Sequence, residues 1–324
     1  MNILITTVPF GKINERPLEL LKGNNQVRYI INPLNRKLKE KELKDMIQDF
    51  DIVIAGTEPI TKNVLESAKN LKLISRVGIG LDNVDLTYAK KKNINVSYTP
   101  DAPTAAVSEL TIGHMINLMR HLPLVDREIR SGKWQRMYGE RLSSRTIGII
   151  GTGRIGSRVL RHLQGFDPNE ILVNDLNPNY NLYNITHSKH VEKDYIYRNA
   201  DIISLHIPLT KLTKNLITKD EIKKMKDTSV IINTSRGGIV NEIDLYTALK
   251  MKNISGAAID VFESEPYSGN LIELDNCLLS CHMGSMTKDC RARMELEATE
   301  EALRFVNGKK LQNRVPEEDY INHN

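Results

Sequence analysis

Three side chains with complementary chemistry follow three apolar, strand-like runs in the last third of the sequence. Arg236 follows a run that ends at residue 234, Glu265 a run that ends at residue 262, and His282 a run that ends at residue 281. In an open parallel sheet, ligands bind beyond the carboxyl ends of the strands. We therefore expect the three side chains to meet at one edge of one sheet and to form a catalytic site there.

Together, the three groups suit the interconversion of an alcohol and a ketone. A guanidinium binds a carboxylate through two parallel hydrogen bonds and polarises a neighbouring carbonyl, which favours a 2-hydroxy or 2-oxo acid as substrate. An imidazole exchanges a proton near neutral pH, and a carboxylate beside it fixes the ring. We therefore expect Arg236 to bind the substrate and His282 to act as acid and base.

Each of these residues also has a structural interpretation. A histidine after a strand usually makes hydrogen bonds within the core, and Arg-Gly-Gly at 236–238 is typical of a turn. Glu263 and Glu265 both precede Pro266, which is typical of a solvated loop, and their spacing does not say which of them pairs with His282. Their joint position at strand ends favours the catalytic interpretation.

A glycine-rich turn earlier in the chain predicts a dinucleotide site. An apolar run at 147–150 leads into Gly151-x-Gly153-x-x-Gly156, and an amphipathic helical pattern follows. The first glycine permits the turn, the second lets the backbone approach a pyrophosphate, and the third lets the helix pack on its strand. The helix N-terminus then offers free N–H groups and a positive dipole end to the phosphates.

Asp175, at the end of the next strand-like run, favours NAD over NADP as the cofactor. A carboxylate accepts hydrogen bonds from the ribose 2′-hydroxyl, whereas its charge repels a 2′-phosphate, and no arginine or lysine follows until Lys189. The alternative is that Asp175 only opens a turn before Asn177-Pro178.

Length and composition are those of a globular protein of about two domains. The chain has 324 residues, 40% of them apolar and 26% charged. No apolar run approaches the length of a membrane span, and the first residues resemble a strand without a basic leader, so we expect a cytoplasmic protein. The net charge of +5 is scattered among acids, and only 5% of residues are aromatic, which argues against a nucleic-acid partner.

The three cysteines do not predict a disulfide framework or a metal site. Cys277, Cys281 and Cys290 are few and clustered, so we expect reduced thiols. Cys277 and Cys281 together with His282 lack the second half of a four-ligand zinc site, so we expect no metal.

Two series of alternating strands and helices indicate an α/β protein with two doubly wound parallel sheets. A helical stretch at 104–120 and a polar arm at 127–145, which carries Trp134, separate the two series. A final amphipathic helix at 289–306 has no strand of its own to follow, so we expect it to pack on the first domain. The prediction is a flavodoxin-like substrate domain, residues 1–99 and 287–324, with a Rossmann cofactor domain, residues 100–286, inserted into it.

The chain resembles the D-isomer-specific 2-hydroxyacid dehydrogenases, and within them the short phosphoglycerate-dehydrogenase-like branch. The resemblance implies an NAD-dependent oxidoreductase that interconverts a D-2-hydroxy acid and its 2-oxo acid by hydride transfer. It also implies that Arg236 binds the substrate carboxylate, that His282 is the acid and base, and that Glu265 pairs with His282. It covers nearly the whole chain and rests on motifs at 75–85, 99–110, 148–156, 204–210, 233–240, 256–266 and 280–284.

Further binding residues follow from the same resemblance. Val77 and Gly78 match a loop whose main-chain N–H groups hold the substrate carboxylate, and Arg76 is the basic residue available for a more distant anion. A homodimer is also implied, in which the arm with Trp134 embraces the partner. The alternative is that Trp134 is buried within its own chain. The expected cofactor contacts are Gly151, Gly153, Arg154, Ile155, Gly156, Asp175, His206, Pro208, Thr213, Thr234, Ser235, Asp260 and Thr104.

Three departures from the family pattern leave the substrate open. Cys281 stands where relatives usually have proline, and Gly284 replaces a common alanine. Phosphoglycerate enzymes often carry a basic residue near the strand end at 54–57, and this sequence has none there. A second hypothesis is an NAD(H)-sensing regulator on the same fold, similar to corepressors that retain the same three polar residues.

Overall fold

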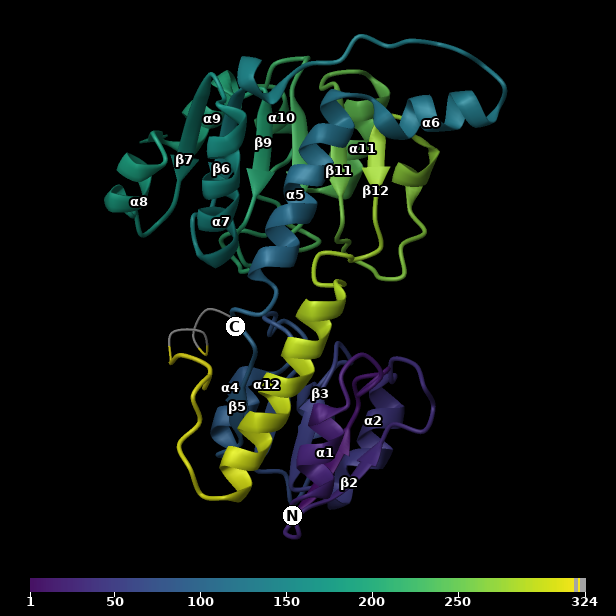
Figure 1. The fold of residues 1–324 in the computed structure, drawn as a ribbon, viewed down its shortest axis with the longest axis vertical. Helices are drawn as coiled ribbons and strands as arrows, with labels where there is room; N and C mark the ends of the chain where they lie inside the picture. Colours follow the sequence, from purple (N-terminus) through teal and green to yellow (C-terminus); the bar gives the residue numbers. More distant parts are fainter. Residues whose placement is uncertain (318–319, 321–324) are drawn as a thin grey trace. The chain divides into compact units, whose positions relative to one another are not determined.

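The computed structural model describes residues 1–317 and 320, and it divides into two units (Figure 1). Unit 1 consists of Met1–Pro103 and Met286–Asn324, and unit 2 of Thr104–Ser285. These limits lie within a few residues of the boundaries expected from the sequence. Each unit is built on its own parallel sheet, and the predicted fold class is confirmed.

Unit 1 is a five-stranded parallel sheet in the order β2-β1-β3-β4-β5. The inner strands β3 and β4 are buried along their whole length, as expected for a sheet that helices cover on both faces. The strands are β1 (Asn2–Ile5), β2 (Arg28–Ile31), β3 (Ile52–Ala55), β4 (Leu73–Arg76) and β5 (Asn95–Ser97). The helices are α1 (Arg16–Lys22), α2 (Glu40–Met46), α3 (Lys62–Ser67), α4 (Leu86–Lys91) and α12 (Lys288–Val306).

The final helix, α12, packs in unit 1 against α1, β3 and β4. The Ser75 hydroxyl in β4 donates a 2.7 Å hydrogen bond to the Ala298 carbonyl of α12. The buried carboxylate of Glu295 accepts a 2.8 Å bond from the Gly11 N–H. These bonds fix the helix across the sheet, so its first turn stays close to the carboxyl ends of the strands.

Unit 2 is a seven-stranded parallel sheet in the order β12-β11-β10-β9-β6-β7-β8. The chain enters at β6, builds outward to β8, and then returns to β9 on the other side of β6, so β6 and β9 flank the switch point where such sheets bind ligands. The strands are β6 (Thr146–Ile150), β7 (Glu170–Asn174), β8 (Ser188–His190), β9 (Ile202–Leu205), β10 (Val230–Asn233), β11 (Gly256–Ile259) and β12 (Cys277–Leu279). The helices are α5 (Thr104–Met119), α6 (Leu122–Arg130), α7 (Arg154–Leu163), α8 (Tyr180–Ile185), α9 (Lys193–Asn199), α10 (Lys219–Ile222) and α11 (Glu242–Lys250).

Two features of unit 2 differ from the sequence-based expectations. The short edge strand β8 was not predicted, because three polar residues carry no hydrophobic period. The predicted arm at 127–145 begins inside helix α6 and continues as an extended segment that arcs away from the sheet (Figure 1). Trp134 in this segment is 79% exposed, so the alternative of a buried tryptophan is wrong.

Candidate active site

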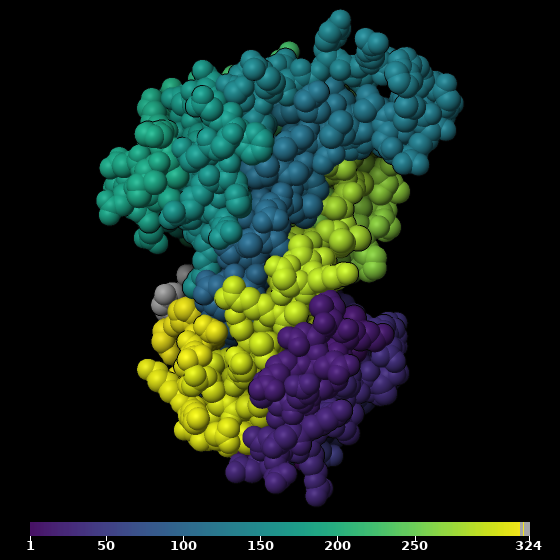
Figure 2. Space-filling model, in the orientation of Figure 1, coloured from purple at the N-terminus to yellow at the C-terminus, as the bar shows by residue number. Residues whose placement is uncertain are grey.

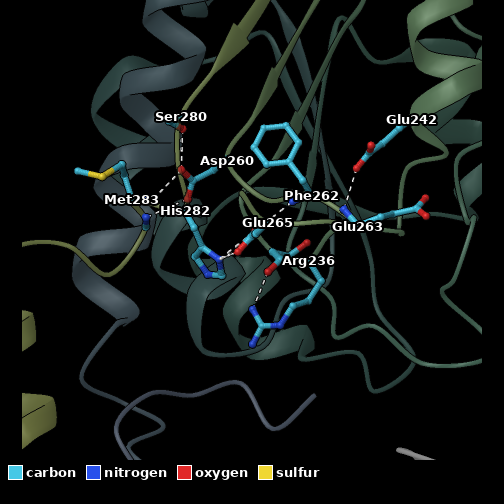
Figure 3. A network of polar contacts seen from close by, with 11 residues as sticks. Arg236, Glu242, Asp260, Phe262, Glu263, Glu265, Ser280, His282 and Met283 are labelled. Atoms are coloured by element: carbon cyan, nitrogen blue, oxygen red, sulfur yellow. Dashed lines mark hydrogen bonds and ion pairs between the residues drawn. The ribbon is translucent and has the colours of Figure 1, made fainter. Parts of the chain in front are cut away.

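The loops after β10, β11 and β12 bring Arg236, Glu265 and His282 together in unit 2 (Figure 3). Nδ1 of His282 lies 2.9 Å and 3.1 Å from the two carboxylate oxygens of Glu265. Arg236 follows β10 within the same network of polar contacts (Figure 3), and its Nη1 donates a 2.6 Å bond to the Ser235 carbonyl. Because Nδ1 is bound to Glu265, Nε2 is the imidazole nitrogen that can exchange a proton with a ligand.

Glu265, and not Glu263, is the carboxylate that reaches the imidazole. The Glu263 side chain points away from His282 (Figure 3), and its backbone N–H donates a 2.7 Å bond to Glu242. Burial raises the pKa of Glu242. Glu265 also accepts a 3.2 Å bond from the Phe262 N–H, which fixes its carboxylate relative to the end of β11.

Gly237 lets the loop that carries Arg236 approach the loop that leads to Glu265. A Cβ atom at this position would lie 2.0 Å from the carbonyl carbon of Phe262, so two backbones meet where only glycine fits. The Asn233 amide donates a 2.8 Å bond to the Arg236 carbonyl and completes the turn. The loop after β10 is therefore packed directly on the loop that leads to Glu265.

Asp260 anchors the loop that carries His282. Its side chain is fully buried and accepts bonds from the Ser280 hydroxyl at 2.6 Å, the Met283 N–H at 2.7 Å and the Gly284 N–H at 2.9 Å. The His282 N–H donates to the Asp260 carbonyl at 2.8 Å. These bonds hold His282 in a left-handed conformation, with φ at 55°, that a non-glycine residue adopts only under constraint.

This arrangement adds two residues to the expected site. Asp260 stays an expected cofactor contact, and both of its carboxylate oxygens also accept bonds within the protein. Ser280 and, behind it, His114 complete the anchor, with 3.3 Å between the Ser280 hydroxyl and His114 Nε2. Burial lowers the pKa of His114, an effect that the charge of Asp260 opposes, so its ring is neutral at pH 7. Ser280 begins the motif at 280–284 but had no role assigned to it, and His114 lies in no motif named above.

The glycine turn between β6 and α7 fits a bound pyrophosphate. A Cβ on Gly151, where φ is 92°, would lie 2.4 Å from the His206 carbonyl oxygen, and a Cβ on Gly156 would lie 2.0 Å from the Gly151 oxygen. A Cβ on Gly153 would meet nothing within 4 Å. The outer glycines are therefore required for packing, whereas the middle one faces open space at the N-terminus of α7.

Asp175 is bound to the glycine turn as well as to its own turn. Its Oδ2 accepts bonds from the Thr152 N–H at 2.6 Å and from the Thr152 hydroxyl at 3.2 Å, and its Oδ1 accepts a 2.8 Å bond from the Asn177 N–H. The Thr152 hydroxyl also lies 2.8 Å from the Tyr183 hydroxyl. The turn interpretation and the ribose interpretation are therefore compatible. Thr152 and Tyr183, which the sequence did not single out, hold the acid at the end of β7.

The loop after β9 carries three further predicted residues. His206 shares a 2.9 Å hydrogen bond with the Ser204 hydroxyl, and burial lowers the pKa of His206 to about 3. The Thr213 hydroxyl donates to the Pro208 carbonyl at 2.6 Å and accepts from the Thr210 N–H at 2.7 Å. His206 is therefore a neutral residue that supports the switch point, and Thr213 closes the loop.

Five other expected cofactor residues lie directly after β10 and in the first turns of α5 and α7. The Thr234 hydroxyl lies 2.9 Å from that of Thr111 in α5, and the Ser235 hydroxyl donates a 2.8 Å bond to Asn233. The buried hydroxyl of Thr104 has no hydrogen-bond partner in the part of the chain that the structure describes. Arg154 and Ile155 form the first turn of α7.

In unit 1, the three expected substrate residues make bonds within the protein. The Val77 N–H donates to the Ala55 carbonyl at 2.8 Å, and the Gly78 N–H donates to the Thr99 hydroxyl at 2.8 Å. Arg76 is buried, and its Nη1 donates a 2.7 Å bond to the Val77 carbonyl. In this conformation Arg76 braces the loop, and the Val77 and Gly78 N–H groups are already used.

Metal and membrane contacts receive no support from the described residues. Among them, no group of three or more histidine, cysteine, aspartate or glutamate side chains is arranged to hold a metal ion. Cys277 and Cys290 are buried, and Cys281 is exposed. No helix in the described part of the chain has the length and apolar character needed to span a bilayer.

Comparison with known proteins decides the family. The model of the D-isomer-specific 2-hydroxyacid dehydrogenase NAD-binding domain matches residues 112–284, which lie within unit 2 and include the glycine turn and all three catalytic candidates. The chain belongs to this family. A hydroxypyruvate reductase from Thermotoga maritima is 36% identical to this dehydrogenase over 270 residues, which cover 81% of this chain and 87% of the relative.

Further relatives and solved structures agree with this assignment. A D-3-phosphoglycerate dehydrogenase from Methanocaldococcus jannaschii is 36% identical over 86% of this chain, which spans 54% of that relative. A glyoxylate reductase structure from Paecilomyes thermophila matches with a TM-score of 0.87 at 26% identity and covers 98% of both chains. The D-lactate dehydrogenase from Aquifex aeolicus, complexed with NAD and lactic acid, matches with a TM-score of 0.85 at 27% identity, over 97% of this chain and 99% of that chain.

This dehydrogenase is therefore an NAD-dependent oxidoreductase that acts on the CH–OH group of a D-2-hydroxy acid. The residues of unit 2 suit that cofactor, because the turn at 151–156 leaves space for a pyrophosphate and Asp175 presents a carboxylate at the end of β7. When bound, NAD accepts the hydride of the alcohol, and NADH returns it to the ketone.

Proposed function

We propose that Arg236, Glu265 and His282 carry out the reaction of this dehydrogenase. The observation that supports the proposal is the contact between both carboxylate oxygens of Glu265 and Nδ1 of His282. A carboxylate in this position fixes the ring and stabilises the imidazolium that forms when the histidine accepts a proton. Nε2 remains for the substrate.

In the direction of oxidation, Nε2 of His282 removes the hydroxyl proton of the 2-hydroxy acid while the C2 hydrogen leaves as hydride. In the direction of reduction, the same nitrogen returns the proton to the carbonyl oxygen. Arg236 pairs with the substrate carboxylate through its planar fork of donors, which orients C2 and favours 2-hydroxy acids over simple alcohols. The loop that carries it packs on the loop that leads to Glu265, because the Gly237 backbone lies against Phe262.

The names of the relatives suggest which acids to test first. They act on hydroxypyruvate, glyoxylate, D-3-phosphoglycerate and D-lactate. We propose a small acid of this class as the substrate, and the cytoplasm as the place where the protein acts.

Steady-state oxidation of NADH with a panel of 2-oxo acids tests the proposal. We expect turnover with at least one of glyoxylate, hydroxypyruvate, its phosphorylated form and pyruvate. The Glu263→Gln variant is the matched control, because it removes a neighbouring carboxylate that points away from His282. Tight NADH binding without turnover on any acid would refute the catalytic proposal and favour the NAD(H)-sensing regulator.

We also propose that helix α6 and the segment after it form the contact of a homodimer. Helix α6 has no buried residue, and Leu122, Ile129, Trp134 and Tyr138 are large apolar side chains exposed on this part of unit 2. Figure 2 shows the segment, in dark teal, on the outer surface. A large exposed apolar patch is typical of an interaction surface, and a two-fold contact lets one such patch cover its copy.

The molar mass in solution tests the dimer. We expect light scattering to give twice the chain mass for the wild-type protein and the chain mass for a variant with Trp134→Ser and Tyr138→Ser. The exposed Tyr195, at the surface of α9, gives a control, because Tyr195→Ser removes a similar side chain elsewhere. A monomeric wild-type protein would contradict this part of the proposal.

A further inference from the structure

One helix of unit 2 contacts two of the three loops that form the candidate active site. Helix α5 packs on β10 and β11, on one face of the unit 2 sheet (Figure 1). The loop after β10 carries Arg236, and the loop after β12 carries His282. The helix and both loops lie within unit 2, so their contacts belong to one folded body.

Three buried side chains share one face of α5. Val107, Thr111 and His114 follow one another at intervals of four and three positions, the spacing that places side chains above each other on a helix. Two of the three are polar. Because a buried polar group is stable only where it finds a hydrogen-bond partner, the partners of Thr111 and His114 show what this face of α5 holds in place.

Thr111 is bonded to the chain just before Arg236. The Thr111 hydroxyl donates a 2.8 Å bond to the Val107 carbonyl of its own helix, and it lies 2.9 Å from the Thr234 hydroxyl. Because a hydroxyl has one proton, and Thr111 gives its proton to the helix, Thr234 is the donor in this contact. Thr234 precedes Arg236 by two positions, so the turn that carries the guanidinium begins at a residue bonded to α5.

His114 makes the equivalent contact to the loop that carries His282. The Ser280 hydroxyl gives its proton to Asp260, at 2.6 Å, and therefore accepts a bond from Nε2 of His114, which lies 3.3 Å away. Figure 3 shows the Asp260 carboxylate bonded both to Ser280 and to Met283, on either side of His282. The loop with the imidazole is thus connected to the same face of α5, at a residue two positions before His282.

Val107 meets the His282 loop on its other side. A Cβ atom on Gly284 would lie 3.2 Å from Cγ2 of Val107 and 3.3 Å from a carboxylate oxygen of Asp260. The backbone at Gly284 therefore lies directly against the helix. As a result, α5 contacts this loop both before and after His282.

We propose that Thr111 and His114 are positioning residues that set the separation between Arg236 and His282. Each is bonded to a residue two positions before one of these side chains, and both belong to one face of one helix. The separation matters because a substrate held by its carboxylate must present its C2 hydroxyl to Nε2 of His282, and a small misplacement of either group slows the reaction. The proposal rests on the roles of Arg236 and His282 proposed above.

Kinetics on the best 2-oxo acid test the two residues separately. Thr111→Val keeps the shape of the side chain but loosens the Arg236 loop, so we expect KM to rise about three- to tenfold while kcat changes less than about twofold. His114→Met loosens the His282 loop, so we expect kcat to fall about three- to tenfold while KM changes less than about twofold. The matched variants Thr111→Ser and His114→Gln keep a hydroxyl and an N–H donor, and we expect both to stay within about twofold of the wild type. The proposal is overturned if Thr111→Val and His114→Met change kcat and KM alike, or if the matched variants lose as much.

Hydrogen–deuterium exchange of the full-length protein without cofactor tests the same contacts without catalysis. We expect amides at 234–238 to exchange about three- to tenfold faster in Thr111→Val, and amides at 280–284 in His114→Met. Ser280→Ala removes the second contact from the other side and should also speed exchange at 280–284, which keeps the test decisive if His114→Met does not fold. Wild-type exchange at both loops in these variants would overturn the proposal. A wild-type protein that turns over no 2-oxo acid refutes the catalytic proposal instead, and the exchange rates then decide by themselves whether α5 fixes the two loops.

Discussion

Replacing Glu265 by glutamine isolates the contribution of one negative charge to the chemistry of His282. The substitution keeps the size of the side chain and leaves an amide oxygen that can accept a bond from Nδ1. What it removes is the charge that lies 2.9 Å and 3.1 Å from that nitrogen. That charge matters most when the imidazole is protonated, so its loss raises the barrier of proton transfer more than it affects binding.

The magnitude follows from the exposure of the pair. The His282 and Glu265 side chains are 42% and 34% exposed, so solvent screens part of their interaction. Hydrogen bonds to charged groups contribute about 1.5–3 kcal/mol, and exposed ion pairs about 0.2–1 kcal/mol. We take about 1–2 kcal/mol for this half-exposed pair, which corresponds to a decrease of about 5- to 30-fold in kcat.

The assay is NADH oxidation on the best 2-oxo acid, with NADH affinity measured separately by fluorescence. We expect kcat to fall in Glu265→Gln while the Kd for NADH stays within twofold of the wild-type value. Glu263→Gln, two residues away, should retain wild-type kcat because its side chain points elsewhere. If the two variants lost the same activity, or if Glu265→Gln kept full kcat, the carboxylate would not act through His282.

Four further outcomes test other parts of the structure. His282→Ala should lower kcat by about 10²- to 10⁴-fold with little change in NADH affinity, and equal losses of both would contradict its role as proton carrier. Gly237→Ala should lower the free energy of unfolding by about 1–3 kcal/mol, because its Cβ would lie 2.0 Å from the Phe262 backbone, and an unchanged Tm would count against that close approach. Asp175→Ala should narrow the preference for NADH over NADPH, measured as a ratio of Kd values, and a constant ratio would show that another group reads the ribose. Because burial lowers the pKa of His206 to about 3, the unfolded chain binds the extra proton first on acidification, and stability should fall below about pH 6.5. The fall should be at most about 1.4 kcal/mol per pH unit, because the group binds a single proton, and chemical denaturation at several pH values should show a flatter profile in His206→Gln.

Features that depend on neighbouring residues were readable from the sequence. The apolar run before Gly151 predicts a strand, and the spacing to Gly156 predicts the turn and helix that follow, because turn geometry and helix packing act over a few residues. The positions of Arg236 and His282 directly after strands were equally local. Parallel topology alone then placed these strand ends at one edge.

Features that depend on distant contacts required the tertiary structure. Glu263 and Glu265 have the same residue type and nearly the same position in the chain, and only the path of the loop after β11 decides which one reaches His282. The role of Asp260 as an anchor likewise depends on donors twenty or more residues away.

The same distinction separates the glycine turn of unit 2 from a pocket of unit 1. The glycine turn and Asp175 lie in one βαβ unit, so the sequence by itself determined a dinucleotide site. The pocket in unit 1 gathers Lys37 and Lys288 from opposite ends of the chain. The packing of α12 across the sheet decides that the two lysines line one pocket. The burial of an apolar helix face fixes the position of α12, but it leaves no local sequence pattern that shows which residues lie beside the helix.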